Sequence, residues 1–133
     1  MCGIVGRVSD ADTGSLRRAL DVMRHRGPDA AAERHFTVRG RHIALGHRRL
    51  SILDLSEAAN QPFVSASGRW VIVFNGEIYN HASLRLSLQS EGVRFRTRSD
   101  TEVLLAGIEL HGDAFLSRLN GMFAFAALEI QTG

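Results

Sequence analysis

The sequence contains no lysine, and all 16 Lys or Arg residues are arginine. This absence excludes a Schiff-base lysine and the lysine of a Walker-type nucleotide loop. Aromatic residues are also few: seven phenylalanines, one tyrosine and one tryptophan among 133 residues. The net charge is only +2, and the arginines are scattered without interleaved aromatics. The sequence therefore does not favour nucleic-acid binding.

Cysteine is nearly absent as well, and its single occurrence is the second residue, Cys2. One cysteine cannot form an internal disulfide. The first residues lack a basic segment followed by a long apolar run, and no stretch approaches the roughly 20 apolar residues of a membrane helix. We therefore expect a cytoplasmic protein that does not associate with a membrane.

Six histidines are present, but none has the spacing of a metal-binding pair, and no second cysteine supports them. We expect no metal and no cofactor in this chain.

The position of Cys2 has a chemical consequence. If Met1 is removed, one residue carries both a thiol, with a reference pKa near ~8.5, and an α-amine, with a reference pKa near ~8. An N-terminal amine can activate the nucleophile beside it. Cys2 taken alone is also compatible with an inert, buried thiol.

The hydrophobic pattern predicts strands at residues 3–8, 34–38, 43–47, 49–53, 70–74 and 121–130, and helices at 15–25, 80–90, 99–111 and 113–119. Strands, two central helices and a further strand indicate an α+β layered domain. Residues 1–133 contain no linker or repeat that would mark a second domain. Since the chain stops directly after its last strand, we expect the C-terminal part of the domain to be missing.

Two local features complete this outline. The Asn75-Gly76 dipeptide is predicted to end the strand at 70–74, because it tolerates positive φ. Arg48 and Arg49 are predicted to lie on opposite faces of one strand, with Arg48 exposed.

Six short motifs occur in a fixed order: MCGI at 1–4, RHRGPD at 24–29, HRRLSI at 47–52, FNGEIYN at 74–80, SDTE at 99–102 and NGMFAF at 120–125. Together they closely resemble the glutaminase domain of glutamine-hydrolysing asparagine synthetases, which are class II, N-terminal-nucleophile amidotransferases. The resemblance covers essentially the whole chain. It implies a layered N-terminal-nucleophile hydrolase fold, with antiparallel sheets sandwiched by helices.

The resemblance also implies a reaction, the hydrolysis of L-glutamine to L-glutamate and ammonia. Cys2 is the implied nucleophile, which forms a γ-glutamyl thioester. The Asn75 side-chain amide and the Gly76 N–H are the implied oxyanion donors. Asn-Gly on its own more often marks a simple turn.

Recognition of glutamine is implied for three further residues. Arg49 resembles the arginine that binds the α-carboxylate, and Asp100 resembles the carboxylate that receives the α-ammonium, with Glu77 as a second candidate. Asp100 also suits the first turn of a helix, and Glu77 could instead form a structural salt bridge. Arg26 is expected to support the nucleophile.

The implied partners are L-glutamine and a C-terminal synthetase domain that uses the ammonia. ATP and Mg²⁺ are expected only on that second domain. Two alternatives stay open: a non-catalytic fragment or interaction module, for which a homodimer is one arrangement, and an amide hydrolase with another substrate.

Overall fold

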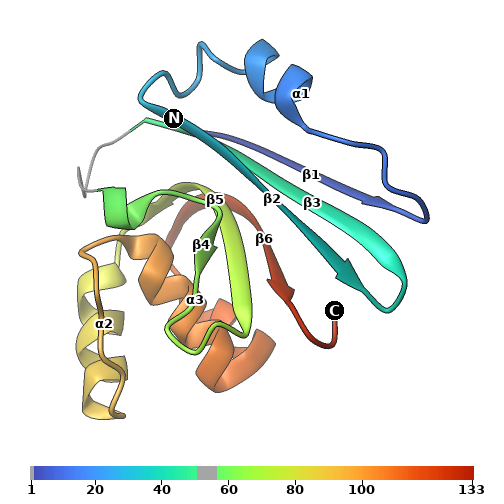
Figure 1. The fold of residues 1–133 in the computed structure, drawn as a ribbon. Coiled ribbons are helices and arrows are strands. Elements are labelled where there is room, and N and C mark those ends of the chain that lie inside the picture. Colours follow the sequence, from blue (N-terminus) through green and yellow to red (C-terminus); the bar gives the residue numbers. More distant parts are fainter. Residues whose placement is uncertain (1, 51–56) are drawn as a thin grey trace.

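The computed structural model describes residues 2–50 and 57–133. Its elements stack in four layers in the order helix, sheet, sheet, helix (Figure 1). Three apolar clusters fill the spaces between successive layers. The predicted layered α+β arrangement is confirmed.

The first sheet contains β1 (Gly3–Ser9), β2 (Ala30–Val38) and β3 (Arg41–Arg49), in the order β1-β3-β2 with all pairs antiparallel. The central strand, β3, is buried on both faces, because alternate side chains point to opposite layers. Ala44 packs against the helix α1 (Arg17–Val22), whereas Leu45 packs against the second sheet.

The second sheet contains β4 (Phe63–Val64), β5 (Trp70–Ile78) and β6 (Gly121–Glu129), in the order β4-β5-β6 and again antiparallel. Val71 and Val73 of β5 face the first sheet, and Ile72 and Phe74 face the helices. The apolar run predicted to be a doubly buried strand is therefore the centre of this sheet.

The outer helical layer contains α2 (His81–Ser90) and α3 (Asp100–His111). Two short 3-10 helices, η1 (Glu57–Ala59) and η2 (Gly112–Arg118), lie before β4 and after α3. None of the helices in the described ranges is both long and apolar enough to span a bilayer.

The sequence Ser99-Asp-Thr-Glu102 has the form of a capping box, which the N-terminus of α3 follows only in part. Ser99 caps the helix by accepting a hydrogen bond from the Glu102 N–H at 3.2 Å. Glu102 does not return the bond to Ser99, as a capping box would require. Its carboxylate accepts instead from the N–H groups of Arg96 and Thr97, and so fixes the loop that leads into α3.

The prediction that Asn75-Gly76 ends its strand is wrong, because β5 continues to Ile78. Gly76 remains within the strand at φ 150°, and a Cβ there would lie 2.2 Å from the Met122 carbonyl oxygen. At this dipeptide the backbones of β5 and β6 lie so close together that only glycine fits at position 76.

Two expectations for β3 also change. Residues 41–49 form one continuous strand rather than two short ones, and residues 51–53 of the predicted strand lie outside the described residues. The prediction that Arg48 is exposed is wrong. Arg48 is buried and donates to the Leu20 carbonyl oxygen at 2.8 Å and to Asp21 at 3.0 Å, because α1 covers this face of the sheet.

Candidate active site

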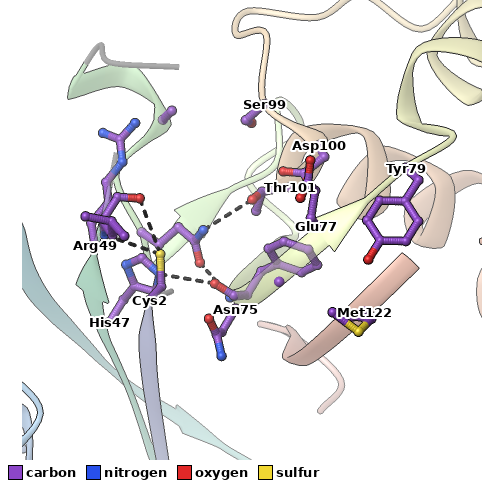
Figure 2. Close-up of a pocket in the computed structure, with 15 residues that line it drawn as sticks. Cys2, His47, Arg49, Asn75, Glu77, Tyr79, Ser99, Asp100, Thr101 and Met122 are labelled. Atoms are coloured by element: carbon purple, nitrogen blue, oxygen red, sulfur yellow. Dashed lines mark hydrogen bonds between the residues drawn. The ribbon is translucent and has the colours of Figure 1, made fainter. Parts of the chain in front are cut away.

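A cavity of about 260 Å³ opens where the C-terminal end of β3, the end of β5 and the start of α3 meet. Its walls include the six residues proposed for catalysis and substrate binding, namely Cys2, Arg49, Asn75, Gly76, Glu77 and Asp100. Figure 2 shows Cys2 and Arg49 on one side of the cavity and Glu77 and Asp100 on the other, with Asn75 between them. The layered fold thus gathers residues that lie far apart in the sequence.

Cys2 lies directly before β1, where three hydrogen bonds hold it, one of them from its thiol to the Leu50 carbonyl oxygen at 3.6 Å. Its Sγ accepts from the Leu50 N–H at 3.3 Å. The Nε of Arg26 donates to the Cys2 carbonyl oxygen at 3.1 Å. Arg26 is not among the cavity-lining residues, so its contact is with the backbone of Cys2 rather than with a bound molecule.

Asn75 and Gly76 present hydrogen-bonding groups close to the sulfur. Asn75 follows Val71 and Val73 on the face of β5 that is turned to the first sheet. Its Oδ1 is buried and has no hydrogen-bond partner among the described residues. A buried amide oxygen with an unmade hydrogen bond is costly.

Arg49 supplies positive charge to one wall of the cavity. The residue is 7% exposed, and its Nη1 donates to Oδ1 of Asn60 at 2.6 Å. This contact orients the guanidinium group, whose planar fork suits a carboxylate.

Asp100 supplies negative charge to the opposite wall. It is 5% exposed, and its Oδ2 accepts from the Ile78 N–H at 3.0 Å. Burial raises the pKa of this carboxyl, although the hydrogen bonds from Ile78 and Thr101 and the charge of His81 oppose the shift. Glu77 is exposed at the rim of the cavity.

Sequence reasoning assigned no site role to five polar residues of this cavity: His47, Gln61, Tyr79, Ser99 and Thr101. His47 is 1% exposed, and burial, aided by the charge of Arg49, lowers its pKa from 6.5 to about 4 despite a hydrogen bond to the Phe74 carbonyl. One signal for His47 was available, since it lies two residues before Arg49 on the same strand face. Thr101 lies within the SDTE motif at 99–102, whereas nothing in the local sequence singles out Gln61.

Among residues 2–50 and 57–133, no three His, Cys, Asp or Glu side chains gather in a way that could hold a metal ion.

Comparison with protein families decides what kind of domain carries this cavity. The family described as "Glutamine amidotransferase domain" matches residues 1–133. The chain belongs to this family.

Relatives of the amidotransferase domain include the glutamine-hydrolysing asparagine synthetase 1 of Bacillus subtilis, which is 42% identical over 132 residues. That match covers 94% of this chain and 20% of the relative. Asparagine synthetase 3 of Arabidopsis thaliana is 37% identical over 134 residues, covering 97% of this chain and 22% of the relative. The predicted relationship to the glutaminase part of these synthetases is confirmed.

A third relative carries a different name. The amidase chry2 of Gibberella zeae is 43% identical over 110 residues, which cover 83% of this chain and 16% of the relative. The amidotransferase domain thus spans only about a fifth of the length of the curated relatives that it matches.

The fold agrees with these relationships. The glutamine phosphoribosylpyrophosphate amidotransferase of B. subtilis, solved with ADP and GMP, superposes with a TM-score of 0.75 at 23% identity. The match covers 95% of the amidotransferase domain and 35% of that chain. The predicted N-terminal-nucleophile hydrolase-type fold is confirmed.

Proposed function

We propose that this chain is the glutaminase part of a glutamine-dependent asparagine synthetase and that it hydrolyses L-glutamine to L-glutamate and ammonia. One observation carries the proposal. A single cavity brings the Cys2 thiol together with two amide groups, a buried arginine and a buried aspartate.

The two buried charges suit a free amino acid. Arg49 binds the α-carboxylate of glutamine, and Asp100 binds its α-ammonium group, with Glu77 at the rim as a second acceptor. A peptide-bound glutamine lacks this pair of charges at its backbone, so the site selects the free amino acid.

The first chemical step forms a thioester. The Cys2 thiolate attacks the side-chain amide carbon, and the carbonyl electrons move onto oxygen. The Asn75 side-chain N–H and the Gly76 N–H stabilise this oxyanion. The intermediate collapses as the nitrogen takes a proton and leaves as ammonia, which gives the γ-glutamyl thioester.

The second step releases glutamate. Water gives a proton to the α-amine of Cys2 as it attacks the thioester carbon, and the same two donors stabilise the second oxyanion. The carbon–sulfur bond then breaks, which returns the thiolate and gives L-glutamate.

Proton transfer is assigned to the α-amine of Cys2, which removal of Met1 exposes. This amine takes the thiol proton, directly or through a water molecule, and supplies a proton to the departing nitrogen. Arg26 fixes the Cys2 carbonyl and so orients the residue that carries both groups. A reactive thiol is best maintained in a reducing compartment, so we place the protein in the cytoplasm.

The ammonia goes to a synthetase domain in the full-length protein, which is where we place ATP and Mg²⁺. This assignment draws on the B. subtilis and A. thaliana relatives, of which the present chain matches only about a fifth.

A second candidate is hydrolysis of another carboxamide, which the amidase-named relative favours. Rates with L-glutamine and L-asparagine, measured before and after Arg49→Ala, distinguish the two. A glutaminase prefers glutamine and loses that preference when the carboxylate partner is removed. An unchanged rate in Arg49→Ala would contradict carboxylate binding by this residue.

The experiment that tests the main proposal uses the uniqueness of Cys2. A diazoketone analogue of glutamine should add its mass once to the methionine-trimmed chain, because there is one cysteine to alkylate. L-Glutamine should protect against labelling, and L-asparagine should not. Cys2→Ala should abolish ammonia release, and Cys2→Ser should nearly abolish it, because a hydroxyl is far less ionised near neutral pH.

Circular dichroism of the two variants provides the control for folding. A folded, methionine-trimmed chain that neither releases ammonia nor reacts with the analogue would refute the glutaminase proposal and leave a non-catalytic module.

A further inference from the structure

Asn75 and Gly76 lie on β5, and the pairing of β5 with β4 stops shortly before these two residues. β4 pairs with β5 only at Phe63–Ile72 and Val64–Val71. The Ser65 N–H donates to the Trp70 carbonyl oxygen at 2.9 Å. Because hydrogen-bonded pairs alternate in an antiparallel ladder, the peptide groups of Phe74 point toward the side of β5 that β4 has left.

Where β4 no longer pairs with β5, two side chains form hydrogen bonds with the backbone of Phe74. Oε1 of Gln61 accepts from the Phe74 N–H at 2.6 Å, and His47 contacts the Phe74 carbonyl oxygen through Nε2 at 3.1 Å. Both side chains are buried, at 8% and 1% exposed. Among the described residues, side chains alone therefore hold the N–H and the carbonyl of Phe74 on this edge, and that carbonyl belongs to the peptide unit directly before Asn75.

The chemistry of the partners sets the hydrogen positions in these contacts. A carbonyl oxygen only accepts, so Nε2 of His47 carries the hydrogen. The amide of Gln61 is oriented from both ends, since its Nε2 donates to the Thr101 hydroxyl at 3.2 Å.

The same two side chains tie together the elements that carry the rest of the site. His47 lies on β3, two residues before Arg49 and on the same strand face. Gln61 reaches Thr101, the neighbour of Asp100 at the start of α3. The peptide of Phe74 is therefore the point where β3, β5 and α3 are joined.

We propose that His47 and Gln61 are positioning residues that hold the Asn75 amide and the Gly76 N–H where the oxyanion forms. The inference rests on the proposed glutaminase function. Neither side chain needs to touch glutamine in this role. Their contribution is to the transition state, because the two amides meet a full negative charge only there.

The test separates transition-state stabilisation from substrate binding. His47→Phe and Gln61→Leu remove the hydrogen bonds while keeping much of each side chain's volume. For each variant, kcat and KM are measured with L-glutamine. The dissociation constant of L-glutamate is measured as well, together with that of the γ-aldehyde analogue of glutamine. The aldehyde adds the Cys2 thiol and places an oxygen where the oxyanion forms.

We expect kcat to fall at least about tenfold, because small misplacements of reacting groups have effects of this size or greater. Aldehyde affinity should fall by a similar factor, whereas KM and the affinity for L-glutamate should stay within about twofold. His47→Gln retains a donor and Gln61→Glu retains an acceptor, so each should recover much of kcat. Asn75→Ala should give the same signature more strongly.

Arg48→Met is the matched control. Arg48 adjoins His47, is also buried and also donates to a backbone carbonyl, that of Leu20. Its loss should lower stability and leave kcat, KM and aldehyde affinity of the folded protein unchanged. If the apolar variants do not fold, His47→Asn and Gln61→Asn, whose side chains are too short to reach Phe74, should show the same selective loss of kcat.

Three outcomes would overturn the inference. The first is a wild-type kcat in every variant that removes a hydrogen bond, namely His47→Phe, Gln61→Leu, His47→Asn and Gln61→Asn. The second is a fall in kcat that is matched by an equal rise in KM and an equal fall in affinity for L-glutamate. The third is a matching loss of kcat in Arg48→Met. Each of these requires an active wild-type chain and leaves the glutaminase proposal standing. A wild-type chain that is inactive refutes the glutaminase proposal and, with it, this inference.

Discussion

Two opposing effects act on the pKa of the Asp100 carboxyl. Its burial between α3 and β5 raises its pKa, whereas the Ile78 N–H and the Thr101 N–H stabilise its charged form. Since the folded state binds this proton more tightly than the unfolded state does, Asp100 lowers stability as the pH rises through its raised pKa. In the proposed site, the ammonium group of glutamine would offset this cost, so that substrate binding would favour the ionised form.

We predict that Asp100→Asn raises KM for glutamine by tenfold to a hundredfold, since a hydrogen bond to a charged group contributes about 1.5–3 kcal/mol. Its effect on kcat should be much smaller. In the wild-type chain, KM should rise as the pH falls through the raised pKa, and in the variant this dependence should disappear. Steady-state kinetics across acidic pH tests both statements. Asp113→Asn, an exposed acid in the first turn of η2, should change neither, and a pH-dependent KM in Asp100→Asn would contradict the assigned role.

The candidate site illustrates which residues a sequence can reveal. Cys2, Arg49 and Asp100 each occur in a recognisable motif, and the structure places all three in one cavity. Gln61 occurs in none of these motifs, because its role depends on β4 beginning only at Phe63, and that start is set by pairing with β5. His47 begins the HRRLSI motif, but its role depends on contact with the Phe74 carbonyl on another strand, which the local sequence does not show.

Among the elements, α3 depends on a glycine in its interior. A Cβ on Gly107 would lie 2.1 Å from the ring of Phe115, which is itself fully buried in the core. The glycine therefore lets the η2 segment pack directly onto the helix. Because α3 also carries Asp100, this packing supports the wall of the cavity opposite Cys2.

We predict that Gly107→Ala destabilises the protein by about 1–3 kcal/mol, the usual range for overpacking. The higher helix propensity of alanine, worth about 1 kcal/mol, should not compensate for the clash. Urea denaturation measures the change. Gly6→Ala is the control, because its new methyl would meet Leu45 at an ordinary 3.6 Å and should leave stability nearly unchanged. Equal stability of Gly107→Ala and the wild type would show that Phe115 can move aside.

Element boundaries were harder to predict than element types. The helix at 81–90 and the strand at 70–74 follow directly from apolar spacing, and both are confirmed. The end of β5 could not be read locally, since Asn75-Gly76 forms a turn in isolation and is kept extended here by pairing with β6 as far as Gly121. Long-range pairing overrides local preference in such cases.

At the scale of the whole molecule, the buried His47 links stability to pH. Folding lowers its pKa from 6.5 to about 4, so between these values the unfolded chain binds a proton that the folded chain does not. The contribution to the free energy of unfolding is intact above pH 6.5 and is lost progressively as the pH falls toward 4.

We predict that His47→Gln flattens the pH dependence of stability between about 4 and 6.5. The difference in slope should approach one proton, or about 1.4 kcal/mol per pH unit at most. Urea denaturation at a series of pH values measures it. His25→Gln, at an exposed position, should leave the slope unchanged. Parallel curves for His47→Gln and the wild type would mean that folding does not change proton binding by His47.

The division of the cavity between two sheets also sets an order of events during synthesis. The ribosome makes the thiol-bearing Cys2 first, whereas Asn75 and Asp100 follow some 70 and 100 residues later. Until β5 and α3 have been made, the sulfur lacks its proposed amide donors, Asn75 and Gly76, and the proposed ammonium partner, Asp100. On the proposed function, a nascent chain therefore hydrolyses no glutamine until the cavity is complete.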